Sequence, residues 1–158
     1  MIHKDQEELT MRILFAASLL ALCMLAIGCD VSGEPVDYDK VCSLGNDKKS
    51  IETKGFLDDA GGVFCSNTSG RMECGFKLKK ELGAEKGFTA DVAIGSGANT
   101  MDELERGYER TDIVIRNNAG EVVDLGKEVT VTGTLSAYQS SEAEGGVGCF
   151  VKVFKIEQ

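Results

Sequence analysis

Residues 126–135, GKEVTVTGTL, contain the pattern that decides the fold. Val129, Val131 and Leu135 fall on one side of an extended chain, as in a β-strand with one buried face. Residues 51–57, IETKGFL, repeat the same form: an apolar residue, a Gly four positions later and a Leu two positions after that. A Gly inside a strand allows the bend or bulge that a closing barrel needs. The two stretches predict two corresponding strands of one small barrel.

The rest of the chain predicts a mainly β domain. Its 158 residues are enough for one domain, and 19 Gly with a single Pro favour turns and strands over long helices. Further strands are predicted within residues 63–78, 90–94 and 149–156. Thr100 followed by Glu103 resembles a capping box, so one short helix is predicted to begin there.

The predicted order is three meandering strands, a short helix and two more strands. This is the order of the OB fold, a small five-stranded Greek-key barrel. Residues 126–133 and a last strand ending in Lys155-Ile156-Glu157 resemble the tRNA-anticodon-like OB-fold lipoproteins of bacterial envelopes. The resemblance covers about residues 48–158 and carries over no catalytic residue. It implies an OB-like barrel over residues 49–158; another small β-sandwich or an open barrel is the alternative.

The N-terminal segment predicts export and lipid attachment. Residues 13–27 contain no charge, which suits the apolar region of a signal peptide and is short for a membrane-spanning helix of about 20 residues. Residues 25–29, LAIGC, resemble the lipobox of bacterial lipoproteins. We therefore expect a signal peptide over residues 1–28, with its start at Met11, and a lipid on Cys29. An ordinary signal peptide or a short buried helix is the alternative.

Residues 30–47 are polar and show no periodic pattern, so residues 29–48 are predicted to be the lipidated cysteine and a flexible tether. The expected location is the cell envelope, facing the extracytoplasmic side, with the membrane bound through the N-terminal lipid. The one histidine, His3, precedes the expected start. A mature chain without histidine excludes histidine-based catalysis and histidine metal sites.

Four cysteines remain in the expected mature domain after Cys29: Cys42, Cys65, Cys74 and Cys149. In an exported chain they suggest two disulfides, with three possible connectivities. A hairpin with a two-residue turn at positions 69–70 places Cys65 opposite Cys74, at a distance that a disulfide accepts. A longer turn would shift this register. With that pair formed, Cys42 pairs with Cys149. The cysteine spacings lack the close pairs of zinc sites, so no metal or other cofactor is expected.

Charge limits the classes of partner. The formal net charge is −9, and an acidic domain is repelled by the phosphates of nucleic acids. OB folds bind ligands across their second and third strands, where Arg71, Lys77 and Lys79 are the candidate binding residues here. The expected partners are an envelope protein, a glycan or a small cationic ligand.

The sequence therefore predicts a lipid-anchored binding or interaction module without enzymatic activity and without catalytic residues. A structural or stress-protection lipoprotein without a discrete ligand is one alternative. The other is an envelope hydrolase that uses carboxylates alone, although no pair of carboxylates stands out in the sequence.

Overall fold

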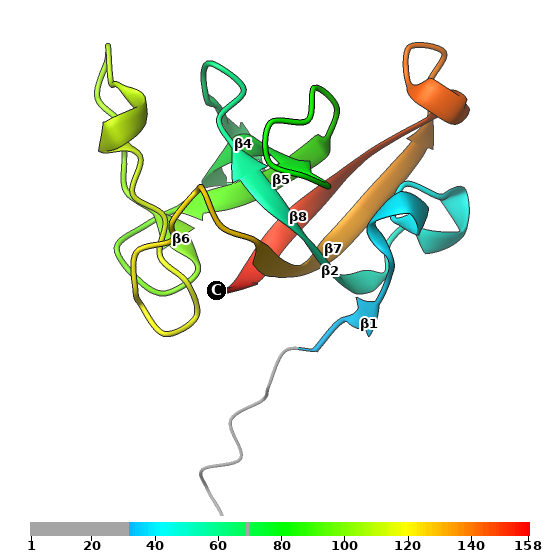
Figure 1. Cartoon of the computed structure of the whole chain (residues 1–158), viewed down its shortest axis with the longest axis horizontal. Coiled ribbons are helices and arrows are strands. Elements are labelled where there is room, and N and C mark those ends of the chain that lie inside the picture. Colours follow the sequence, from blue (N-terminus) through cyan, green and yellow to red (C-terminus); the bar gives the residue numbers. More distant parts are fainter. Residues whose placement is uncertain (1–31, 69) are drawn as a thin grey trace, which may run out of the picture. The chain divides into compact units, whose positions relative to one another are not determined.

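The protein is described here from a computed structural model, which places residues 32–68 and 70–158. The predicted signal peptide and Cys29 lie outside the described residues. Residues 32–158 form one compact unit with strands as its main elements (Figure 1). The strands are β1 (Glu34–Pro35), β2 (Ser50–Asp58), β3 (Phe64–Thr68), β4 (Arg71–Lys79), β5 (Phe88–Ile94), β6 (Thr100–Met101), β7 (Val129–Gln139) and β8 (Val147–Glu157). The mainly β prediction is confirmed, while the five predicted strands become eight.

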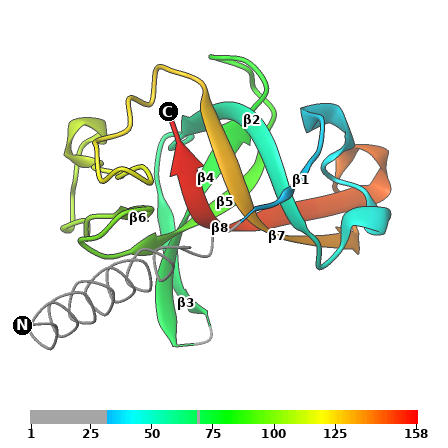
Figure 2. The same ribbon diagram turned by 90° about the horizontal axis from the view of Figure 1, so that it is seen from below.

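The strands belong to one sheet, in the order β1-β2-β7-β8-β5-β4-β3, with β6 beside β5. β2 has two long neighbours: residues 50–55 pair with β7, and residues 56–58 pair with β4. Neighbouring long strands run antiparallel except β5 and β8, which are parallel. Figure 2 shows β2, β7, β8, β5 and β4 around a common centre. β2 thus pairs with both end members of the series β7-β8-β5-β4.

The core follows from the alternation that the sequence shows. Buried residues alternate with more exposed ones along much of each long strand, and the largest fully buried side chains include Ile51, Leu57, Phe76, Leu78, Leu135 and Ile156. Their burial supplies most of the stabilisation, at roughly 25 cal/mol for each Å² of apolar surface removed from water. The outward residues of the same strands are then free to form a binding surface.

Both predicted strand glycines lie where backbones approach closely. β2 changes its partner from β7 to β4 at Gly55, and an ideal Cβ there would lie 2.6 Å from the carbonyl oxygen of Lys79. The register of β7 against β8 shifts between Thr132 and Gly133, which is the predicted irregularity. Both glycines therefore lie at a close approach of two backbones, one at a change of strand partner and the other at a bulge.

The predicted short helix is wrong. Thr100 and Met101 form β6 instead, and the Thr100 hydroxyl donates to the carbonyl oxygen of Gly97 at 2.7 Å. Both side chains are buried, so their position in the core decides the backbone conformation. The helices of residues 32–158 are short 3-10 turns: η2 (Tyr38–Lys40), η3 (Leu44–Asn46), η4 (Arg110–Asp112) and η5 (Glu144–Gly146). Within the described ranges no helix is long and apolar enough to span a membrane.

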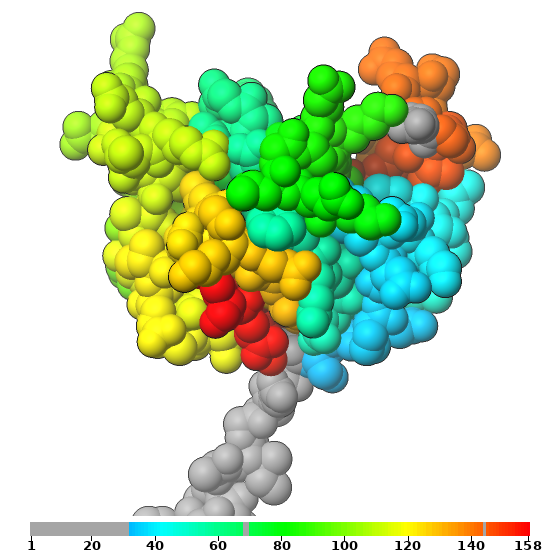
Figure 3. Space-filling view, viewed as in Figure 1, coloured from blue at the N-terminus to red at the C-terminus, as the bar shows by residue number. Residues whose placement is uncertain are grey.

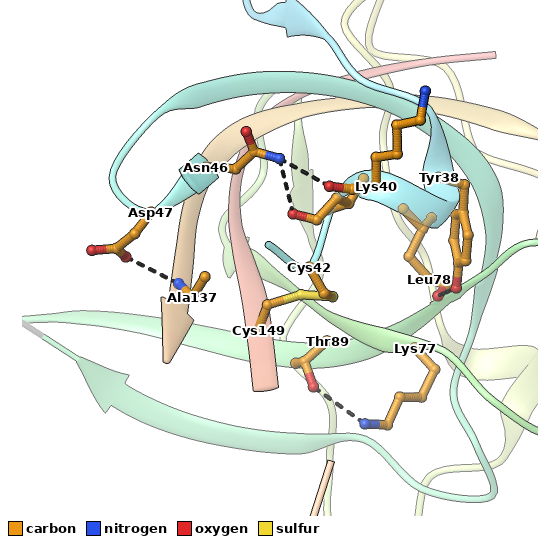
Figure 4. Close-up of a disulfide and its surroundings, with 11 residues drawn as sticks. Tyr38, Lys40, Cys42, Asn46, Asp47, Lys77, Leu78, Thr89, Ala137 and Cys149 are labelled. Atoms are coloured by element: carbon orange, nitrogen blue, oxygen red, sulfur yellow. Dashed lines mark hydrogen bonds between the residues drawn. A yellow bond between two sulfur atoms is a disulfide. The ribbon is translucent and has the colours of Figure 1, made fainter. Parts of the chain in front are cut away.

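The predicted tether is also too long. β1 pairs with β2, Val41 is fully buried, and Cys42 forms a disulfide with Cys149. The Asp47 carboxylate accepts a hydrogen bond from the backbone N–H of Ala137 at 3.0 Å (Figure 4). Residues 34–48 therefore pack against the sheet as part of the domain. Their polar composition hid this, because the attachment combines one fully buried valine and one disulfide with hydrogen bonds to neighbouring strands.

Candidate functional site

A cleft of about 1020 Å³ opens on the described surface. One wall is the β4–β5 loop with the neighbouring ends of both strands, and the other is the tip of the β7–β8 hairpin. Figure 3 shows the hollow between these two segments, drawn in green and orange. Residues of η2 and the Cys42–Cys149 disulfide lie at its floor. Clefts of this size that combine apolar and polar side chains are the usual form of a ligand site.

Tyr138 provides a flat aromatic surface in the cleft. It pairs with Gly148 across the β7–β8 hairpin, and an ideal Cβ on Gly148 would lie only 2.8 Å from the tyrosine ring. The ring therefore rests directly on the glycine backbone. Tyr138 is still 52% exposed, so its ring remains accessible to a ligand. Packing on one side and exposure on the other fix a stacking surface in advance of binding.

Two further aromatic residues join the opposite wall to the floor. The rings of Tyr38 and Phe88 have centroids 5.2 Å apart, and the Tyr38 hydroxyl donates to the carbonyl oxygen of Leu78 at 2.7 Å (Figure 4). Burial raises the pKa of the Tyr38 phenol, so it stays a neutral donor at physiological pH. These contacts hold η2 against the start of β5 and give this side of the cleft a fixed shape.

The disulfide at the floor has the predicted partners. Cys42 and Cys149 have Cα atoms 5.4 Å apart, and Cys65 and Cys74 have Cα atoms 4.0 Å apart within the β3–β4 hairpin. Cys65 also faces Cys74 in the strand register, as the sequence predicted. Only the first disulfide belongs to the cleft, where it fixes the N-terminal segment to β8 (Figure 4).

Charged side chains surround the aromatic groups. Lys80 forms an ion pair with Asp39 at 2.6 Å, and Lys77 donates to the hydroxyl of Thr89 at 3.3 Å. The carboxylates of Glu81, Glu85 and Glu142 line the cleft and form no ion pair with any other residue in the described ranges. The unpaired charge of the cleft is therefore mostly negative.

The structure separates the three basic residues that were predicted to bind ligand together. Lys77 alone lines the cleft. Lys79 is 9% exposed and forms an ion pair with Asp58, which lowers the pKa of that carboxyl through the hydrogen bond. Arg71 is exposed at the opposite end of β4, next to the hairpin turn. They do not form a common basic patch, because β4 spreads them along its whole length.

Comparison with known proteins finds no match. No family model matches the sequence, and no curated protein or solved structure matches it either.

The sequence did not predict the aromatic part of the site. Tyr38 was assigned to the tether, and Tyr138 stood at the edge of a polar loop. One signal was available: Tyr138 and Gly148 are equally distant from the Ser- and Glu-rich loop between β7 and β8, and a hairpin register would have paired them.

A second polar cluster lies on β4, β5 and β8, away from the cleft lining. The Lys152 ammonium forms an ion pair with Glu73 at 2.7 Å, and Asp91 is the register partner of Lys152. Burial raises the pKa of Asp91, the Glu73 charge raises it further, and Lys152 opposes both. Glu73 and Asp91 thus lie on the neighbouring strands β4 and β5. Because Glu73 forms an ion pair with Lys152, the cluster links β4, β5 and β8 through charge.

We expect Asp91→Asn to stabilise the protein at about pH 7, by less than about 1 kcal/mol. A carboxyl whose folded-state pKa is raised contributes stability below its unfolded-state pKa and loses that contribution as pH rises through the folded-state pKa. The neutral amide removes this loss. Urea unfolding at about pH 7 and about pH 3 tests the prediction, since the gain should vanish at the lower pH. An equal or larger gain at the lower pH would contradict it.

Proposed function

We propose that the chain is a lipid-anchored, non-catalytic binding module of a bacterial cell envelope, and that the cleft is its binding site. The observation that carries the proposal is the Tyr138 ring, which rests on Gly148 and stays 52% exposed inside a cleft of about 1020 Å³. A rigid, exposed aromatic ring in a concave site is a feature of recognition surfaces. A structural lipoprotein has no need of such a surface.

We further propose that the domain is a closed five-stranded barrel of the OB type. β2, β4, β5, β8 and β7 would form the barrel in that order around its axis. Two observations support this: β2 pairs with both β4 and β7, and β5 pairs in parallel with β8. The cleft then lies between the loop joining the second and third barrel strands and the loop joining the fourth and fifth.

The lipid anchor is proposed from the sequence. Residues 25–29, LAIGC, follow an uncharged stretch of signal-peptide length. The compact unit begins at Ser32, so the predicted lipid attachment site at Cys29 precedes it by three residues. A lipidated Cys29 would thus place the domain close to the membrane surface.

The anchor is tested by expressing the full chain and its Cys29→Ser variant in bacterial cells with a clickable palmitate analogue. We expect the unchanged chain to carry the label and to sediment with membranes, and the variant to lose both. A variant that keeps the label would overturn lipidation at Cys29.

The binding site is tested in the same cells by photocrosslinking. A benzoylphenylalanine replaces Tyr138 in one full-length variant and Val122 in the control, two side chains that are 52% and 63% exposed. We expect a discrete adduct from position 138 and none from position 122. Equal adducts from both positions, or none from position 138, would refute the cleft as a binding site and would favour the structural alternative.

A further inference from the structure

We infer that the ligand of the cleft is an extended polypeptide segment that carries lysine or arginine side chains. It pairs with the edge of β8 at residues 147–149, which no described strand occupies. This inference rests on the proposed function, because it names the chemical class of ligand for the same cleft. The backbone of β8, the charges around the cleft and the Tyr138 ring support it separately.

The two edges of β8 differ in how much of their length is paired. One edge pairs with β7 along the whole strand, whereas the other pairs with β5 only at residues 150–152. Val147, Gly148 and Cys149 come before this pairing, and all three line the cleft. In an antiparallel ladder every second residue directs its N–H and C=O away from the partner strand. The start of β8 therefore presents backbone hydrogen-bonding groups to the cleft, and an extended peptide is the ligand that pairs with such an edge.

Charge decides which peptide is favoured. Three lysines line the cleft: Lys80 forms an ion pair with Asp39, Lys86 is also engaged, and Lys77 keeps its charge because it donates to the neutral hydroxyl of Thr89. The carboxylates of Glu81, Glu85 and Glu142 have no ion-pair partner among the described residues, and the chain carries a formal net charge of −9. A cationic segment is attracted by this field, and an acidic one is repelled.

Tyr138 offers a contact for a cationic side chain, because its ring is the exposed aromatic surface on the β7–β8 wall. An ammonium or guanidinium group over a tyrosine ring gains about 0.5–1 kcal/mol at an exposed site, which corresponds to about two- to fivefold in affinity. Alternate side chains of a peptide on β8 point to opposite faces. A lysine or arginine on one face would meet the ring while its neighbours meet the walls.

The test uses the full chain, labelled with ¹⁵N, in micelles of a neutral polyoxyethylene detergent. The probe is a capped hexapeptide of alternating Lys and Thr. Its controls are the Glu-Thr hexapeptide, the Lys-Thr hexapeptide with alternate backbone nitrogens methylated, spermine and chitotetraose. We expect the Lys-Thr hexapeptide alone to shift the amide signals of Tyr138, Val147 and Gly148 at low salt, and the shifts to fade as salt is added.

Matched variants separate local charge from net charge. The triple variant Glu81→Gln, Glu85→Gln, Glu142→Gln removes three charges at the cleft, and Glu103→Gln, Glu105→Gln, Glu128→Gln removes three exposed charges outside its lining. We expect the first triple variant to lower the affinity for the Lys-Thr hexapeptide by about tenfold, and the second by about twofold or less. Tyr138→Leu keeps an apolar side chain on Gly148 and should lower the affinity for the Lys-Thr hexapeptide by about two- to fivefold.

Three results would overturn the inference. Equal binding of spermine or of the methylated peptide would show that no strand pairing is involved. Equal weakening by the two triple variants would show that net charge alone attracts the probe. If chitotetraose shifted the amide signals of cleft residues and the hexapeptide did not, the ligand would be a glycan and not a peptide. The cleft would remain the binding site. The cleft as a binding site is refuted separately, by photocrosslinking in cells, if position 138 captures nothing or no more than position 122.

Discussion

Replacing Cys42 and Cys149 together by Ala is expected to destabilise the protein by about 4.8 kcal/mol, against about 2.6 kcal/mol for Cys65 and Cys74. The difference comes from the unfolded chain. The first disulfide closes a loop with a sequence separation of 107, and the second closes one of 9. A longer closed loop removes more conformational entropy from the unfolded state.

The folded state adds to the same difference. Cys42 directly follows Val41, which is fully buried, and the same short segment carries Tyr38 of the cleft floor. Without the disulfide, burial of Val41 and the pairing of β1 with β2 must hold the segment in place. The β3–β4 hairpin, in contrast, keeps five register pairs between its strands when its disulfide is removed.

Urea unfolding of the two double variants, followed by circular dichroism under non-reducing conditions, measures both free energies. The reduced unchanged protein is the control and should be at least as unstable as the Cys42, Cys149 variant. Equal losses for the two double variants would contradict the entropic reasoning. In that case local packing, and not loop length, would determine the contribution of each disulfide.

Local regularities made much of the fold predictable. The alternation in residues 51–57 and 129–135 placed two strands of the sheet, and the hairpin register placed Cys65 opposite Cys74. These predictions succeeded because each depends on residues within one strand or one turn, where the two-residue period leaves a single solution.

The predictions that failed depend on contacts between distant residues. Thr100 and Glu103 have the spacing of a capping box, but Met101 is fully buried and bridges to Ile115, so the chain stays extended. Helix propensity is a weak preference, and tertiary burial overrides it here. The segment around Val41 failed for the same reason, since its attachment is to β2 and β8.

The cleft could not be predicted, because its lining comes from three separate parts of the chain. η2, the β4–β5 loop and the β7–β8 hairpin are brought together by long-range contacts: the parallel pairing of β5 with β8, the disulfide between Cys42 and Cys149, and the packing of Tyr38 on Phe88. The basic residues on β4 were predicted to share one binding surface because they are close in sequence. A strand separates such residues by about 3.3 Å at each step and turns alternate ones to opposite faces.

Gly133→Ala is expected to cost about 3 kcal/mol, at the upper end of what overpacking causes. An ideal Cβ at Gly133 would lie 2.5 Å from a methyl carbon of Val151 and closer still to the carbonyl oxygen of Lys152. The carbonyl oxygen cannot rotate away as a flexible side chain can, so the bulge between Thr132 and Gly133 must shift. That shift would disturb the longest strand pair of the sheet.

Gly97→Ala is the matched control, because an ideal Cβ at Gly97 meets no atom within 4 Å. Both substitutions reduce the freedom of the unfolded chain by the same amount, so Gly97→Ala should be neutral or stabilising by up to about 1 kcal/mol. Urea unfolding of both variants isolates the cost of the close approach, since the unfolded-state contribution cancels between them. If Gly133→Ala were as stable as the control, β7 and β8 would have to tolerate a wider separation at the bulge. The close crossing at Gly133 would then not be required by the fold, and the shared Gly of residues 51–57 and 129–135 would lose its physical explanation.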